Sequence, residues 1–156
     1  MSPRGDEGEK VVASNRKARH DYAIQETLEC GIALTGDDVK SLRGGRASLT
    51  EAYARVRDGE VWLEGMHVPP YEQGDTKHHL PMRPRKLLLH RREIDHLAEL
   101  QDEQRVALIP LRVYFTHGIA KVEIGVGKGK RQFEKRQSIA KRDAEREMQQ
   151  AANRRR

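Results

Sequence analysis

The chain has 156 residues, which fits one compact domain with appendages, and it carries 30 Lys and Arg against 24 Asp and Glu, a formal net charge of +6. Its single cysteine excludes an internal disulfide, and no apolar run approaches the roughly 20 residues that cross a bilayer. The first ten residues lack an apolar core and mix both charge signs, unlike a secretory signal or a lipid anchor. We therefore expect a cytoplasmic protein.

The positive charge is concentrated at one end of the chain. Residues 127–156 hold eleven basic and four acidic side chains, a net of +7, whereas residues 1–126 hold 19 and 20, a net of −1. Six of the seven aromatic residues also lie in the first part. We expect disorder over residues 1–9, a folded domain over 10–126, and a basic tail over 127–156 that is disordered or becomes helical on a polyanion.

The first predicted elements are a strand and a short helix. Apolar residues alternate over most of 22–34, which predicts a half-buried strand. Asp37 or Asp38 is expected to cap a helix that ends before Gly44 and Gly45.

The segment from Ser48 to Gly59 allows either a helix or a strand before a predicted turn. Ser48 and Glu51 have the spacing of a capping box, which would begin a helix, but a strand is preferred from about Ala52 onward. Asp58 and Gly59 stand between two apolar segments and predict a tight hairpin.

The remaining elements are a loop, a helix and a second hairpin. Prolines and glycine between positions 69 and 84 predict a loop, and residues 93–100 have the spacing of a short amphipathic helix. Segments 106–115 and 119–126 are expected to pair around the His117 and Gly118 turn. About five or six strands without strand–helix–strand alternation predict a mainly β fold: a small antiparallel barrel of the oligonucleotide-binding type, with flanking short helices.

The sequence contains no recognisable catalytic or metal constellation. Cys30 lies in an alternating strand, where a small core residue is expected. His78 and His79 lie in the proline-rich loop without further nearby ligands, so a zinc site is not predicted. We expect no metal, no cofactor and no small-molecule substrate.

Two basic clusters favour a polyanionic partner over a solvated charge run. The first directly precedes the predicted strand and consists of Asn15, Arg16, Lys17, Arg19 and His20; the second consists of Arg83, Arg85, Lys86, Arg91 and Arg92. Basic side chains bind phosphate, and a chain with so few aromatics lacks the stacking platforms of a general single-strand binder. Folded RNA is therefore the predicted ligand.

Four motifs resemble the SsrA-binding protein family, SmpB: NRKARHDY at 15–22, DDVKSLRGG at 37–45, RPRKLLLHRREID at 83–95 and KVEIGVGKGKRQFEKR at 121–136. The resemblance runs from about residue 11 to residue 148. It implies an oligonucleotide-binding-like barrel that binds the tRNA-like domain of transfer-messenger RNA (SsrA) and delivers it to stalled bacterial ribosomes. The barrel would replace the anticodon arm and the tail would enter the vacant mRNA channel. In this process, trans-translation, the nascent chain is tagged for degradation and the ribosome is released.

The resemblance also implies roles for particular residues. Asn15, Glu29, Leu88 and Lys121 match family positions needed for the RNA interaction. Together with the basic clusters they give the predicted RNA-binding set: Asn15, Arg16, Lys17, Arg19, His20, Glu29, Arg85, Lys86, Leu88 and Lys121.

A second set is predicted for the tail. Glu134, Lys135 and Arg136 match a decoding-region motif that usually begins with Asp, so Glu134 keeps the charge and adds one methylene. Gly129 matches a family position and suits a hinge. The predicted contacts with the decoding centre and mRNA channel are Lys128, Lys130, Arg131, Glu134, Lys135, Arg136, Lys141 and Arg142.

Two other functions remain open at this point. One is an RNA-processing enzyme that uses His20 with Asp21, or His90 with Arg91, although neighbouring residues usually face different ways. The other is a structural protein of the ribosome. The adaptor reading predicts a monomer on its RNA, without a membrane partner.

Overall fold

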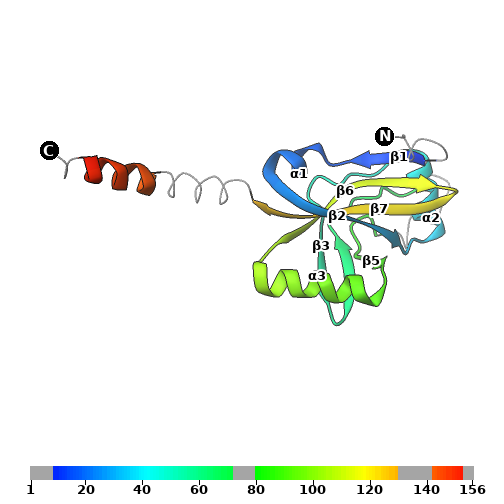
Figure 1. Ribbon diagram of the computed structural model, residues 1–156. Coiled ribbons are helices and arrows are strands. Elements are labelled where there is room, and N and C mark those ends of the chain that lie inside the picture. Colours follow the sequence, from blue (N-terminus) through cyan, green and yellow to red (C-terminus); the bar gives the residue numbers. More distant parts are fainter. Residues whose placement is uncertain (1–8, 72–79, 130–141, 153–156) are drawn as a thin grey trace.

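The computed structural model describes residues 9–71, 80–129 and 142–152 (Figure 1). Its labelled elements are β1 (Glu9–Ser14), α1 (Arg16–Asp21), β2 (Tyr22–Ile32), α2 (Gly36–Arg43), β3 (Tyr53–Arg57), β4 (Glu60–Glu64), β5 (Arg85–Leu88), α3 (Arg91–Gln104), β6 (Ala107–Thr116) and β7 (Ile119–Gly129). Residues 142–152 are also helical, and every side chain of that helix is exposed.

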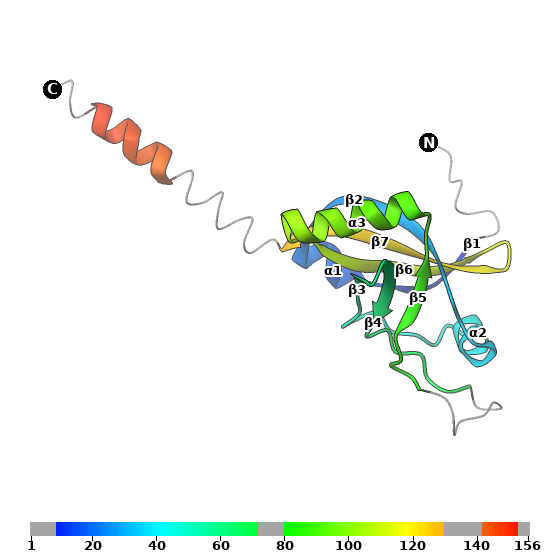
Figure 2. The ribbon, with the colours of Figure 1, turned by 90° about the horizontal axis from the view of Figure 1, so that it is seen from below.

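The strands form a closed ring. Its order is β6, β3, β4, β5, β2 and β7, and β7 pairs with β6 again, with every pairing antiparallel. β1 pairs with the later part of β6, from Arg112 to Thr116, whereas β3 pairs with β6 at Leu108. α2 and α3 lie on different sides of the barrel (Figure 2). The predicted mainly β antiparallel barrel with short helices is confirmed.

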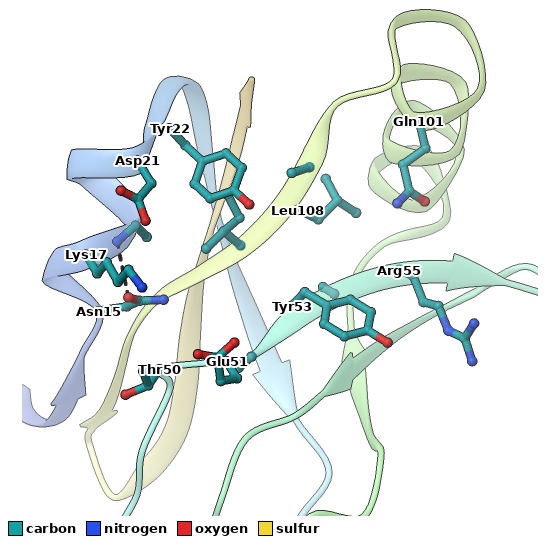
Figure 3. A pocket seen from close by; sticks show the side chains of 15 residues that line it. Asn15, Lys17, Asp21, Tyr22, Thr50, Glu51, Tyr53, Arg55, Gln101 and Leu108 are labelled. Atoms are coloured by element: carbon teal, nitrogen blue, oxygen red, sulfur yellow. Dashed lines mark hydrogen bonds between the residues drawn. The ribbon is translucent and has the colours of Figure 1, made fainter. Parts of the chain in front are cut away.

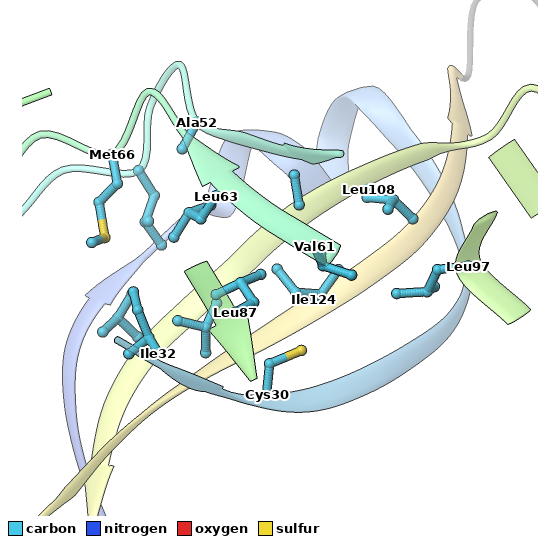
Figure 4. Close-up of a cluster of buried hydrophobic side chains, with 14 of the residues drawn as sticks. Cys30, Ile32, Ala52, Val61, Leu63, Met66, Leu87, Leu97, Leu108 and Ile124 are labelled. Carbon is cyan, nitrogen blue, oxygen red and sulfur yellow. The ribbon is translucent and has the colours of Figure 1, made fainter. Parts of the chain in front are cut away.

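The barrel interior is filled by aliphatic side chains from all six ring strands and from α3 (Figure 4). Cys30 is fully buried among them, as expected for a small core residue. Burial raises the pKa of its thiol to about 12, with a further contribution from the charge of Glu93. Leu97 is the one fully buried residue of α3, so this amphipathic helix contributes to the core through a single deep contact.

A smaller apolar cluster lies outside the main core. Ala18, the buried residue of α1, packs against Ile109 and Leu111 of β6, with Tyr22 and Ile24 beside them. Because β6 is irregular between Pro110 and Arg112 and covered on this side by α1, it buries side chains on both faces. This packing fixes α1 on the outside of the barrel.

Both predicted hairpins are confirmed. Asp58 and Gly59 have φ angles of 53° and 74°, and His117 and Gly118 have φ angles of 50° and 77°. Positive φ at both central residues is the signature of the turn whose twist matches antiparallel strands. A glycine at the second position removes the steric cost there.

One predicted helix start is wrong, and after Ser48 the structure has the preferred strand instead of the alternative helix. α2 is capped by Thr35, whose hydroxyl accepts from the Asp38 amide at 3.2 Å while the Asp38 carboxylate accepts from the Thr35 amide at 3.3 Å. No helix begins at Ser48, because its backbone instead exchanges hydrogen bonds with His67.

The structure also adds two elements and moves several of the expected boundaries. β1 and α1 were not among the predicted elements. β1 begins at Glu9, one residue before the expected start of the folded domain, and β7 continues to Gly129, three residues past its expected end.

Candidate nucleic-acid interface

Three of the predicted RNA-binding residues come from different strands and meet on one outer face of the barrel. Leu88 of β5 pairs with Gly31 of β2, which pairs with Lys121 of β7, which pairs with Tyr114 of β6. Glu29 lies two residues from Gly31 and therefore on the same face. We call these five residues the outer patch. Leu88 is 52% exposed, so the patch offers apolar surface beside a carboxylate and an ammonium group.

An ionic network supports the outer patch from β1, β6 and β7. The Tyr114 hydroxyl donates to the Glu29 carboxylate, and the Arg112 guanidinium lies 4.2 Å from the centre of the Tyr114 ring. Arg112 also pairs with Glu9 and, at 3.5 Å, with Glu123. Burial raises the pKa of the Tyr114 phenol, and the hydrogen bond to Glu29 raises it further, so the phenol remains a protonated donor.

Sequence reasoning missed Tyr114, Arg112 and Glu123 as parts of the site. The outward side of the last strand was visible as Lys121 and Glu123, but their neighbours on β6 depend on the register. That register places Tyr114 beside Lys121 and Arg112 beside Glu123.

α1 carries the first basic cluster on its exposed side. Arg16, Lys17, Arg19 and His20 are all exposed. Arg19 pairs with Glu123 at 3.4 Å, which joins α1 to the network of the outer patch. These side chains are therefore accessible to phosphate, and their RNA contact stays a prediction.

Asn15 has a structural position instead. Its side-chain oxygen accepts from the Ala18 amide at 3.2 Å and caps α1, while its amide nitrogen donates to the carbonyls of Leu49 (3.3 Å) and Pro110 (3.2 Å). The residue is only 9% exposed. In this conformation the polar atoms of Asn15 hold α1 against the barrel, and its direct RNA contact stays a prediction.

Arg85 also has a structural position, in the interior of the domain. The residue is fully buried, and its guanidinium forms two hydrogen bonds with Asp38, at 3.1 and 3.3 Å. It also donates to the carbonyls of Met66 (3.0 Å), Arg83 (3.1 Å) and Pro81 (3.3 Å). A guanidinium in the interior with these bonds has no donor facing solvent in this conformation, and the RNA contact of Arg85 stays a prediction.

Asp38 is the centre of this interior cluster. Arg83 also donates to its carboxylate. Burial alone would raise the pKa of Asp38, but the hydrogen bond and charge of Arg85 outweigh it, and the pKa lies below its ordinary value. The cluster joins α2 to β5 and to the loop before it.

Lys86 lies on the opposite face of β5 from Arg85, at the surface. It pairs with Glu60 at 2.8 Å, and both side chains are about 40% exposed. Its strand neighbour Trp62 lies under the Arg57 guanidinium, 5.3 Å from the ring centre. Lys86 is therefore accessible to phosphate at the edge of the outer patch.

Of the residues predicted for the tail, two lie within the part of the chain that the structure describes. Lys128 lies in β7, paired with Ala23, and belongs to the barrel. Arg142 lies in the exposed helix. The predicted residues Lys130, Arg131, Glu134, Lys135, Arg136 and Lys141 lie outside the described residues.

A groove of about 590 Å³ runs between α1, β3, α3 and β6 (Figure 3). Lys17 and Arg55 line it together with Asp21 and Glu51, so its charges balance. The alternative catalytic pair, His20 and Asp21, does make contact at 3.1 Å, but both side chains are exposed to solvent. No cluster of metal-ligating side chains occurs among the described residues.

Comparisons with known proteins place these features in a family context. A family model described as SmpB protein matches residues 12–154. The chain is 61% identical over 150 residues to the SsrA-binding protein of Salinispora arenicola (strain CNS-205), covering 96% of this chain and 94% of the relative. It is 57% identical over 146 residues to the SsrA-binding protein of Desulforudis audaxviator (strain MP104C), covering 94% and 95%.

A solved structure described as "tmRNA-SmpB: a journey to the center of the bacterial ribosome" is also similar. It has a TM-score of 0.63 and 49% sequence identity, over 75% of this chain and 82% of that one. Within the described residues, no helix has the length and apolar character to cross a membrane.

Proposed function

Because the chain belongs to the SmpB protein family, we propose that it is the RNA-binding adaptor of trans-translation. In this role it binds the tRNA-like domain of transfer-messenger RNA and delivers it to stalled ribosomes. The observation that carries the proposal is the similarity to proteins named SsrA-binding protein, over 96% of this chain for the Salinispora arenicola protein, together with the similarity to the tmRNA-SmpB structure over 75% of it.

The barrel supplies the selective RNA contact. The outer patch combines three kinds of interaction: Lys121 for phosphate, Leu88 for an apolar sugar or base edge, and Glu29 for a hydrogen-bond donor. Exposed cations on α1 and the half-exposed Lys86 extend the surface. A domain of nearly neutral net charge with local cations suits docking on one folded RNA, where the barrel replaces an anticodon arm.

The tail supplies a different contact. Beyond β7, residues 130–156 hold ten basic and four acidic side chains, a net charge of +6, and the described helix, residues 142–152, buries none of its side chains. Such a segment has no apolar stripe for a protein partner but suits a channel lined by rRNA phosphate. We assign to it the vacant mRNA channel and the decoding centre.

Deleting residues 130–156 tests this division. The truncated protein is expected to bind transfer-messenger RNA almost as tightly as the full chain and to lose tagging on stalled ribosomes in a purified system. A parallel loss of binding and tagging would contradict separate roles. The narrower variant Lys135→Ala with Arg136→Ala should reproduce the tagging defect, and normal tagging by it would remove the decoding role from that motif.

The adaptor needs no catalysis of its own, and it acts in the cytoplasm as a monomer on its RNA. The contact between His20 and Asp21 is the one observation that favours an RNA-processing enzyme. Incubating the full chain with labelled structured RNA, with and without divalent metal, separates the two functions. We expect intact RNA, whereas cleavage that His20→Ala abolishes would favour the enzyme.

A further inference from the structure

We infer that Tyr114 is a positioning residue for RNA recognition: its hydroxyl fixes the Glu29 carboxylate so that Glu29 accepts a hydrogen bond from an RNA donor. The donor is either a ribose 2′-hydroxyl or a base amino group. This inference rests on the proposed function and on the outer patch as the RNA-contacting surface.

Tyr114 is built to hold a fixed direction. The residue is 1% exposed although it belongs to neither apolar cluster, because the Arg112 guanidinium covers its ring. Arg112 is itself held by carboxylates from β1 and β7. The phenol therefore reaches from β6 across β7 to the carboxylate on β2, with its ring unable to swing into solvent.

Glu29 needs such a partner because of its neighbour. Glu29 and Glu123 are directly opposed on β2 and β7, and like charges at such positions repel. Glu123 is neutralised by Arg112 at 3.5 Å and Arg19 at 3.4 Å. Among the hydrogen bonds described for Glu29, the Tyr114 hydroxyl is the one that opposes this repulsion and keeps the carboxylate at the patch.

The chemistry of the patch selects the kind of RNA group. A carboxylate repels phosphate and only accepts hydrogen bonds, so a productive contact to RNA requires a hydroxyl or an amino group. The tyrosine occupies one oxygen of Glu29 and leaves the other available. Gly31 stands between Leu88 and Lys121, and the Leu88 side chain fills the space that a side chain at position 31 would take, so this apolar group lies against the strand on the face that carries Glu29.

The first test is the affinity of the full chain for the tRNA-like domain of transfer-messenger RNA. Tyr114→Phe removes the hydroxyl and keeps the ring under Arg112, and we expect affinity to fall about five- to tenfold, the scale of one typical net hydrogen bond. Tyr53→Phe is the matched control, because its hydroxyl also bonds a carboxylate, that of Glu64, on β3 and β4. Equal affinity of Tyr114→Phe and wild type would overturn the inference.

A double-mutant cycle separates positioning from general stabilisation. If Tyr114 acts through Glu29, adding Tyr114→Phe to Glu29→Ala causes no further loss of affinity. Additive losses would overturn the inference, since Tyr114 would then act independently. If Glu29→Ala binds normally, the inference fails while the proposed function stands; if the wild-type chain fails to bind this RNA, the proposed function fails first.

The RNA donor is identified by changing the RNA. Single 2′-deoxy substitutions remove a ribose hydroxyl, and inosine for guanosine removes a base amino group. The substitution that weakens binding to wild type but has no effect on Glu29→Ala marks the donor and its source. If every substitution weakens both proteins equally, Glu29 accepts from neither group and the inference is overturned.

Discussion

The molecule contains two clusters of arginines and carboxylates with the same functional groups and opposite surroundings. In the interior cluster, Arg85 and Asp38 have no solvent exposure. In the outer cluster, the paired side chains of Arg112, Glu123 and Arg19 are between 21% and 60% exposed. The first joins α2 to β5, and the second joins α1 to the strands that carry the outer patch.

The difference in solvent exposure gives the two clusters different roles. A charge in the interior is stabilised only by its partners, so losing one partner leaves a charge that water cannot reach. An exposed pair gains little from its partner and keeps its cations available to an anionic ligand. Basic residues that are adjacent in the sequence therefore differ: Arg85 stabilises the interior, whereas Lys86 remains accessible for the RNA contact proposed for it.

The largest expected effect breaks the interior cluster. Arg85→Ala should lower the free energy of unfolding by about 3–5 kcal/mol, because it leaves the Asp38 charge buried without its main partner. Chemical denaturation measures this, with Arg92→Ala, an exposed arginine, as the control.

Arg85→Lys sharpens the same comparison. Lysine keeps the charge but lacks the planar fork that makes two bonds to Asp38 and three to carbonyls, so it should also destabilise the fold. A stable Arg85→Lys variant with unchanged RNA affinity would show that charge alone suffices at this position.

A smaller effect is expected at Asn15, on the border between interior and surface. Asn15→Ala should cost about 1–2 kcal/mol, because it removes the cap of α1 and the donor to two buried carbonyls. RNA affinity should fall with it, since α1 carries exposed cations. Asn15→Asp retains the capping oxygen but places a carboxylate oxygen against the same two carbonyls at a buried site, so it should destabilise the fold at least as much as Asn15→Ala.

The smallest effect on stability is expected at Lys86. Lys86→Ala should change the free energy of unfolding by at most about 0.5 kcal/mol, because both members of its pair with Glu60 are half-exposed. Its RNA affinity should nevertheless fall, and the salt dependence of binding should decrease by about one phosphate contact. Glu60→Gln is the control, because it frees Lys86; a loss of affinity there equal to that of Lys86→Ala would remove Lys86 from the interface.

The sequence predicts the elements whose signals are local. Asp58 with Gly59 and His117 with Gly118 mark both hairpins, and alternating apolar residues mark most of β2 and the part of β7 up to residue 126. β1 was missed because its six residues, with adjacent valines and no alternation, become a strand only by pairing with β6. α1 was missed because it is six residues long and buries a single alanine.

In the candidate site, too, the sequence identifies single residues but not the contacts between distant segments. The motif resemblance marks Glu29, Leu88 and Lys121, but only the strand register shows that they surround Gly31. Arg85 shares the inward face of β5 with Leu87, yet an inward arginine is expected only with a partner. That partner, Asp38, lies 47 positions earlier, and no local pattern connects the two.

β7 determines how a mechanical load on the tail would reach the barrel. Its last residue, Gly129, is paired with Tyr22, and two residues earlier Gly127 is paired with both Ile24 and Ala107. Because the hydrogen bonds of an antiparallel ladder run perpendicular to the strands, a pull along β7 loads many of them together instead of opening them one by one. Tension on the tail is thus shared with β2 and β6, and through β2 it reaches the strand that carries Glu29.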